Sequence, residues 1–322
     1  MNLKQAGLGF LSGYFSTHDR SDKTKAAYAT DLSQFREFAG EALEMGSLSA
    51  TLIERWAAHL RSEAYSPASL RRKVAAVKVF CSYWVRKGDL KESPFWRVKI
   101  SIGRIQQLPR SLTEGETRAL LTQARQQCTV RAFYSKGATE AQRGRVTTAS
   151  YRASRDLALV ELLFATGMRV GEASALDVGD FFAQDGAFTV RGKGGQGRLA
   201  FVVDASALQI QKDHLEARAA VETDSRALFL NVFGKRLSTQ GMARTIARLQ
   251  GQAGVQRHVT PHMLRHTVAT MLLRNGADVR IVQEFLGHAS IATTQRYTHV
   301  TKEHLISALK RYHPSASLRL AS

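Results

Sequence analysis

The chain has 322 residues, 44% of them hydrophobic, and a formal net charge of +19. Its length suggests two domains, its hydrophobic fraction is enough for ordinary cores, and no apolar run reaches the roughly 18 residues of a membrane span. Because basic residues are in excess in both halves, we expect a polyanion that is gripped by both domains. Charge alone leaves RNA and an anionic membrane open beside DNA.

Cysteine content and the N-terminus indicate where the chain works. Cys81 and Cys128 are the only cysteines, and two cysteines in predicted helices make no disulfide framework. A reducing, cytoplasmic compartment fits this usage. Residues 1–15 have no basic flank ahead of a continuous apolar run, so we expect no signal peptide.

Residues 1–105 are predicted to form a helical domain. Three helix starts are indicated by capping residues or by a proline in the first turn: Ser21 or Asp22, Ser49, and Ser66-Pro67. The third helix carries apolar residues at helical spacing along one face: Leu70, Val74, Val77, Cys81 and Trp84. Such a stripe predicts a packed core.

A linker is expected to run to about residue 112, and residues 113–322 are expected to form the second domain. Thr113 and Glu116 have the spacing of a capping box, which starts its first helix. Residues 129–155 then carry six basic residues against Glu140 alone. This basic segment suggests a mobile loop, an extra DNA contact or a partner contact, and its charge favours nucleic acid.

The remainder of the second domain mixes helices with a small sheet. One helix is predicted to stop at Gly167, and Thr260-Pro261 opens another. Short strands at 188–191 and 199–203 flank a glycine-rich turn. The fold class is therefore mainly α, with a helical N-terminal domain and a mixed, mostly helical second domain that holds a small β-sheet.

Five motifs follow one another in the second half of the chain. They supply an arginine, a lysine, a His-x-x-Arg pair, a Leu-Gly-His and a tyrosine, in this order: Arg169, Lys193, His262 with Arg265, His288, and Tyr297. Taken singly, each residue fits a structural role such as a helix-end charge, a turn lysine or a packing tyrosine. Taken jointly and in order, they surround one phenol with cationic and proton-carrying groups, which suits a phosphodiester substrate.

The chemistry of a phosphodiester explains these residue types. A tyrosine hydroxyl, with an ordinary pKa of about 10, attacks well only when its proton is removed during the attack. Arginine stays charged, and its planar fork matches phosphate geometry, so Arg169 and Arg265 are expected to neutralise the non-bridging oxygens. Lys193 is the expected general acid at the leaving oxygen. His262 shares a helix face with Arg265 and suits proton transfer or a hydrogen bond, and His288 is expected to donate another.

In this order the motifs resemble the tyrosine recombinases, the family of lambda integrase, Xer and Cre. The resemblance runs from about residue 112 to the end, and the preceding residues are organised like that family's DNA-clamping domain. It implies that Tyr297 forms a covalent phosphotyrosine with DNA and that the other five motif residues assist it. It also implies that Glu172 braces Arg169. Neither a metal nor another cofactor is implied, because the energy of the cleaved phosphodiester bond is conserved in the phosphotyrosine bond.

The resemblance further implies a site-specific recombinase that closes around duplex DNA as a C-shaped clamp. A dimer would occupy each site, four protomers would form the synapse, and strands would be exchanged in pairs through a Holliday junction. Integration, excision, inversion and dimer resolution all fit. The alternatives are a non-catalytic DNA-binding regulator on the same scaffold and a type IB topoisomerase.

The third helix of the first domain is the predicted DNA contact. Four basic side chains lie off its apolar stripe: Arg71, Arg72, Lys73 and Lys78. A solvated helix face is the structural alternative. With the resemblance, we expect these side chains to contact the DNA backbone.

Two further patterns in the second domain are discounted as cofactor sites. His262 and His266 have a spacing that can hold zinc, but no carboxylate or cysteine completes the set. The glycine-rich turn around Lys193 lacks the spacing, the following Ser or Thr and the strand-to-helix setting of a phosphate-binding loop.

A last short helix with a polar tail is expected after Lys302. Leu305, Ile306 and Leu309 share one face, and so short a helix needs a surface to dock on. That surface is either its own domain or, as in similar recombinases, the neighbouring protomer. We expect docking on the neighbour.

Overall fold

The computed structural model describes the chain outside residues 19–21, 103–110, 137–139, 192–196, 288–300 and 320–322. Side chains are also left undescribed at 23, 130–148, 316 and 319. The chain divides into two compact units, Met1–Gln107 and Leu108–Ser322. None of the helices in the described ranges is long and apolar enough to cross a membrane.

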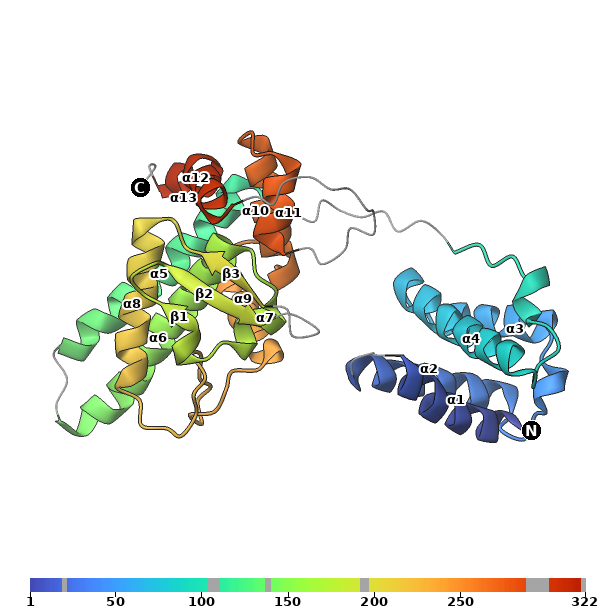
Figure 1. Cartoon of the computed structure of the whole chain (residues 1–322). Coiled ribbons are helices and arrows are strands. Elements are labelled where there is room, and N and C mark those ends of the chain that lie inside the picture. The colour runs from blue at the N-terminus through green and yellow to red at the C-terminus, as the bar shows by residue number, and fades with distance from the viewer. Residues whose placement is uncertain (19–21, 103–110, 137–139, 192–196, 288–300, 320–322) are drawn as a thin grey trace. The chain divides into compact units, whose positions relative to one another are not determined.

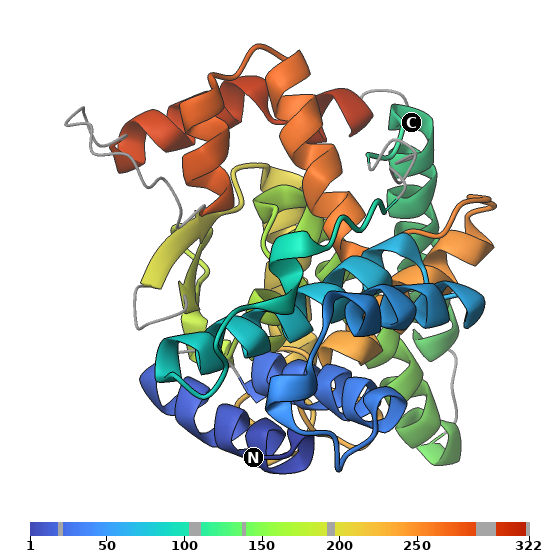
Figure 2. The same cartoon turned by 90° about the vertical axis from the view of Figure 1, so that its right-hand side faces the viewer.

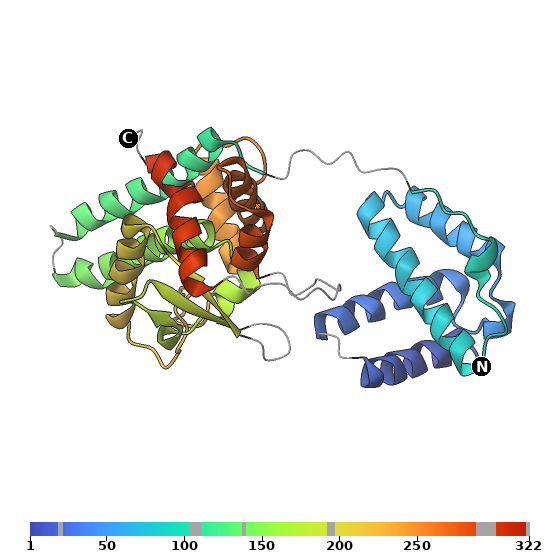
Figure 3. The same ribbon diagram turned by 45° about the horizontal axis from the view of Figure 1, so that its top comes forward.

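The first unit is a group of helices, drawn in blue to teal in Figures 1 and 3. Its elements are α1 (Leu3–Thr17), α2 (Asp22–Ala39), the 3-10 turn η1 (Met45–Ser47), α3 (Ala50–Ser62), α4 (Pro67–Lys87) and the 3-10 turn η2 (Pro94–Arg97). The predicted helix starts at Ser49 and Ser66 are confirmed, because each hydroxyl accepts a backbone N–H of the first turn. Helix α4 ends at Gly88, whose φ of 84° is left-handed and suits glycine.

Aromatic side chains dominate the core of the first unit. Phe10, Phe35, Trp56 and Phe80 are all buried. The rings of Phe35 and Trp56 meet edge to face with centroids 5.6 Å apart, and Phe10 and Phe80 do so at 5.6 Å. The apolar stripe predicted on α4 therefore does face a core.

Lys73 corrects the predicted DNA-contact face of α4. Its side chain is only 3% exposed, and its ammonium donates to Asp31 at 3.1 Å and to Gln34. Arg72, which is half-exposed, pairs with the same carboxylate. Burial in this ion pair removes Lys73 from the exposed basic face, on which Arg71 and Lys78 remain.

Replacing Lys73 with methionine should lower the free energy of unfolding of the full chain by about 1–3 kcal/mol, because a buried carboxylate loses a partner. Lys78→Met is the matched control, since Lys78 lies one turn away but is exposed, and it should change stability by less than about 0.5 kcal/mol. Denaturant titration measures both. Equal effects of the two substitutions would contradict the buried assignment.

The second unit places helices around a small sheet (Figure 1). Its helices are α5 (Glu114–Lys136), α6 (Glu140–Thr166), α7 (Val170–Ala175), the 3-10 turn η3 (Val178–Asp180), α8 (Ala205–Ala219), α9 (Thr239–Gln252), α10 (Pro261–Arg274), α11 (Val279–Leu286), α12 (Lys302–Tyr312) and α13 (Ser315–Arg319). Its strands are β1 (Phe181–Phe182), β2 (Ala187–Arg191) and β3 (Gly197–Phe201). The mainly helical fold class is confirmed.

Helix α6 is the centre of this unit. Residues 157–165 are buried on every side of the helix, as expected for a helix enclosed by other elements. Even Glu161 is buried, and Arg125 of α5 donates to its carboxylate at 2.9 Å. The capping box that starts α5 is also confirmed, because Thr113 and Glu116 exchange backbone-to-side-chain hydrogen bonds.

The sheet is antiparallel with the order β1-β2-β3. Val190 of β2 faces Arg198 of β3 in the pairing register. The rings of Phe181 and Phe188 stack 4.3 Å apart and hold β1, a strand the sequence did not predict, onto β2. The predicted pair of strands around the glycine-rich turn is confirmed.

The basic segment 129–155 is helical wherever the structure describes it. Residues 129–136 continue α5 and residues 140–155 form the first part of α6. Of the three alternatives for this segment, the mobile loop is therefore wrong for these residues.

The C-terminal helices dock on their own unit, contrary to the expectation of docking on a neighbour. Leu305 and Leu309 of α12 are buried in the core of the second unit, and Ile306 packs against it. The expected polar tail contains α13, whose Leu318 is buried as well. Figure 2 shows α10, α11 and α12, in orange to red, gathered at one end of this unit.

Candidate active site

Arg169 is presented by a sharp break between α6 and α7. Gly167 ends α6 with φ +56°, and a Cβ there would lie 2.8 Å from Phe285 and 3.0 Å from Leu286, so both conformation and packing require glycine. Two residues later, Arg169 occupies the position before α7. Its backbone N–H donates to Glu172 at 2.8 Å, and its exposed guanidinium donates to the other oxygen of that carboxylate at 2.7 Å.

Arg265 ties two helix ends together. It projects from α10 and is only 8% exposed. One terminal nitrogen donates to the carbonyl of Gly167 at 2.6 Å and the other to the carbonyl of Leu286 at 2.7 Å. Both carbonyls lie at helix C-termini, where the helix dipole favours a cation. Arg265 therefore fixes the segments that lead into Arg169 and His288, and its bonds to described residues leave some of its five N–H donors for a ligand.

Arg198 completes the cluster, and the sequence did not identify it. This β3 residue donates to Glu172 at 3.1 Å and to the carbonyl of Phe285 at 3.4 Å. Arg198 shares a strand face with buried Ala200, since side chains alternate along a strand. An arginine on the inward face of a strand is the signal that could have found it.

The cluster is electrostatically positive, because its three guanidinium groups outnumber two carboxylates, Glu172 and, near Arg198, Glu284. Burial, together with repulsion from Arg169 and Arg198, lowers the pKa of Arg265 to about 10, so it stays cationic at neutral pH. Burial alone would raise the pKa of Glu172, but hydrogen bonds from Arg169 and the charge of Arg198 hold it below its ordinary value. The site is therefore built to receive an anion.

A groove of about 830 Å³ opens between α10 and α11 beside this cluster. Arg265 and His262 line it together with apolar residues such as Met263, Val282 and Leu286. His262 is exposed in the first turn of α10, which Thr260 caps by accepting the N–H of Met263. The structure thus brings His262 and Arg265 to one surface, as their spacing predicts.

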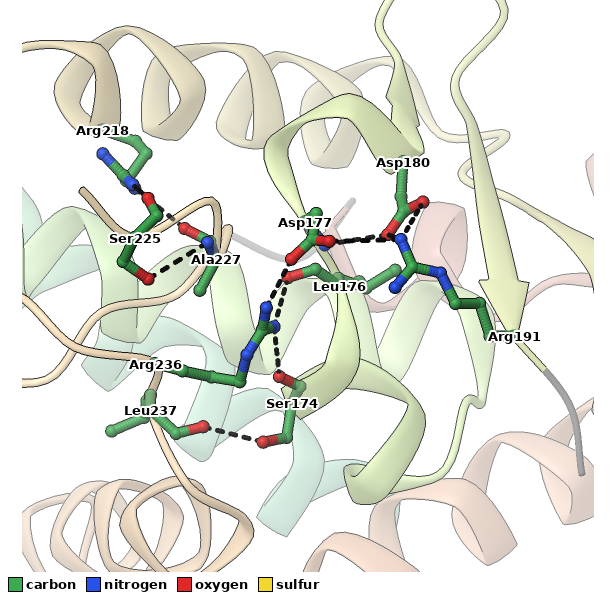
Figure 4. Close-up of polar contacts among 10 residues, drawn as sticks. All are labelled: Ser174, Leu176, Asp177, Asp180, Arg191, Arg218, Ser225, Ala227, Arg236 and Leu237. Carbon is green, nitrogen blue, oxygen red and sulfur yellow. Dashed lines mark hydrogen bonds and ion pairs between the residues drawn. The ribbon is translucent and has the colours of Figure 1, made fainter. Parts of the chain in front are cut away.

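A second polar network stands beside α7 (Figure 4). Arg236 donates to the carbonyls of Ser174 and Leu176 at 2.9 and 3.0 Å and pairs with Asp177. Asp177 also accepts from Arg191, the last residue of β2, at 3.1 Å. The β2 side of the glycine-rich turn is therefore tied to the segment that follows α7. The sequence did not predict this network either.

Three predicted residues, Lys193, His288 and Tyr297, lie outside the described residues. Around Lys193 the described chain ends at Arg191 and resumes at Gly197. Around His288 and Tyr297 it ends at Gly287, which closes α11 with φ +63°, and resumes at Thr301. Within the described ranges, no three His, Cys, Asp or Glu side chains gather as a metal site.

Two family models match the chain. The Phage integrase family matches residues 139–304, which include all six predicted catalytic positions. The N-terminal SAM-like domain of phage integrases matches residues 9–88. These two matches fall in separate units of the structure.

Curated relatives match nearly the whole chain. Tyrosine recombinase XerC of Listeria innocua is 32% identical over 95% of this chain and 97% of its own. Tyrosine recombinase XerD of Oceanobacillus iheyensis is 32% identical over 92% and 94%. Among solved structures, a lambda integrase tetramer bound to a Holliday junction shares the fold, with a TM-score of 0.66 and 17% identity over 92% of this chain and 80% of that one. The chain therefore belongs to the phage integrase family, the tyrosine recombinases.

Proposed function

We propose that this chain cuts and rejoins duplex DNA at specific sites, with Tyr297 as nucleophile and a covalent phosphotyrosine as intermediate. One observation carries the proposal. Arg265 holds together the helix ends that lead to Arg169 and His288, and the three guanidinium groups of Arg169, Arg198 and Arg265 outnumber the carboxylates of Glu172 and Glu284 beside them. A site with that excess of guanidinium suits a phosphodiester.

In the proposed reaction the Tyr297 oxygen attacks phosphorus as its proton leaves. The new bond joins phosphorus to the tyrosine oxygen, and the bond to the sugar oxygen breaks. Negative charge develops on the non-bridging oxygens, where Arg169 and Arg265 neutralise it. Each preorganised donor of this kind contributes about 3–4 kcal/mol to lowering the barrier.

Proton transfers are assigned to the remaining motif residues. Lys193 protonates the departing sugar oxygen. His262, exposed at the start of α10, moves a proton or holds a phosphate oxygen, and His288 donates a further hydrogen bond. The reverse attack by a sugar hydroxyl on the phosphotyrosine reseals the DNA, so no external energy source is consumed.

The proposed substrate is a duplex site that binds a dimer, and two such sites form a tetrameric synapse that passes through a Holliday junction. The lambda integrase tetramer with its junction, the XerC and XerD relatives and the net charge of +19 support this assembly. Arg71, Arg72 and Lys78 are the proposed backbone contacts in the first unit. A DNA substrate puts the reaction in the cytoplasm.

The test starts from duplexes that the full chain selects from a random pool. A plasmid with two copies of the selected site should give deletion or inversion products without ATP and in the presence of a chelator. Relaxation of a one-site plasmid without recombinants would identify a topoisomerase instead. Binding without any strand cleavage would identify a regulator.

A further inference from the structure

We infer that Arg198 is a positioning residue of the strand-transfer reaction, acting through Glu172 and the end of α11. The inference rests on the proposed function, because it assigns Arg198 to the same site. Arg198 is outside the six predicted motif positions, and its side chain is 20% exposed. Its side chain contacts Glu172, which holds Arg169, and the end of α11, which leads to His288.

The first contact sets the direction of Arg169. Glu172 holds Arg169 with one oxygen at 2.7 Å and Arg198 with the other at 3.1 Å. The oxygen that accepts from Arg198 also accepts the backbone N–H of Arg169 at 2.8 Å, so Arg198 adds a second, charged donor to it and ties it to β3. Arg198 therefore fixes the plane of Glu172, which in turn fixes the exposed guanidinium of Arg169.

The second contact sets the end of α11. Arg198 donates to the carbonyl of Phe285 at 3.4 Å and passes directly under Gly287. A Cβ on Gly287 would lie 2.3 Å from the Nε of Arg198 and 2.4 Å from its Cδ. Because Gly287 has no side chain, it leaves the space in which Arg198, the second residue of β3, lies.

The charge balance gives Arg198 a second effect. Glu172 paired with Arg169 alone would form a locally neutral couple. Arg198 and Arg265 add two positive charges beside this couple, and Glu284 near Arg198 adds one negative charge, so the cluster keeps an excess of positive charge. That excess remains available to the phosphate, although Arg198 itself is turned toward Glu172 and Phe285.

The experiment uses the full chain and a nicked duplex of the selected site, which traps the covalent intermediate. At saturating protein, Arg198→Met should slow adduct formation about 30- to 100-fold, as misplaced catalytic groups do, while the duplex Kd changes less than threefold. Arg198→Lys keeps a cation near Glu172 but cannot span both contacts, so it should recover part of the rate. Wild-type rates in Arg198→Met, or a loss confined to Kd, would overturn the inference.

Arg125→Met is the structural control. Arg125 of α5 also pairs with a buried glutamate, Glu161 of α6, but neither residue belongs to the arginine cluster. Arg125→Met should lower the melting temperature as Arg198→Met does. Its rate of adduct formation at saturating protein should stay within about threefold of the wild-type rate, because a loss of stability need not change the stabilisation of the transition state. Equal slowing by both substitutions would mean that Arg198 acts only by holding the fold.

A double-mutant cycle tests the packing of Gly287. Gly287→Ala should slow cleavage by displacing Arg198, whereas in an Arg198→Ala background the added methyl meets no guanidinium. The strain of alanine at φ +63° is present in both backgrounds and cancels in the comparison. Gly287→Ala should therefore slow cleavage less in the Arg198→Ala background than in the wild-type background, and equal slowing in the two backgrounds would overturn the inference. Failure of the wild-type chain to form any adduct would instead refute the proposed function.

Discussion

Replacing Tyr297 with phenylalanine should abolish the covalent protein–DNA adduct and leave duplex binding nearly unchanged. The substitution removes one oxygen, which is the only atom that can bond to phosphorus in the proposed reaction. It keeps the ring and alters no charge, so the duplex Kd should change by less than about threefold.

A nicked duplex of the selected site, followed by denaturing electrophoresis, measures the adduct. Tyr312→Phe is a matched control, because Tyr312 is a half-buried tyrosine of α12 in the same unit. Its adduct yield should equal that of the wild type. Undiminished adduct from Tyr297→Phe would move the nucleophile to another residue and refute the assignment.

Removing either clamping arginine should slow cleavage by about 10²–10³-fold at saturating protein, because each acts mainly on charge that develops in the transition state. The two should differ in stability. Arg169 is exposed and holds only Glu172, so Arg169→Ala should leave the unfolding free energy almost unchanged. Arg265→Ala strands two buried carbonyls, so it should also cost about 1–3 kcal/mol per carbonyl left unpaired.

Single-turnover cleavage and denaturant titration separate the two effects. Arg280→Ala is the control, since Arg280 is exposed on α11 and is not assigned to the phosphate site. It should change neither the cleavage rate at saturation nor the stability. Full cleavage activity in Arg169→Ala or Arg265→Ala would contradict the proposed clamp.

Local signals accounted for much of the fold. Ser49, Ser66-Pro67, Thr113 with Glu116 and Thr260-Pro261 all start the helices they predict, because a cap is satisfied by atoms within one turn. Gly167 likewise ends α6. Such signals depend on a few consecutive residues, so the sequence contains all the information needed to interpret them.

Contacts between distant residues were harder to predict. Arg198 meets Glu172 only when β3 lies beside α7, and no local rule pairs residues 26 positions apart. The burial of Lys73, in contrast, could have been predicted from the sequence. Lys73 lies three residues after Leu70 and four before Val77, which places it on the apolar face of α4. The basic segment 129–155 looked like a loop because charge and small residues outweighed its weak helical pattern.

Arg265 has a consequence for the safety of a protein that cuts DNA. The side chain that we propose as a phosphate clamp also holds Gly167 and Leu286 together. If those helix ends separate, the guanidinium loses its place at the same moment. In the proposed mechanism, a damaged or partly unfolded copy would therefore cleave DNA far more slowly than an intact molecule.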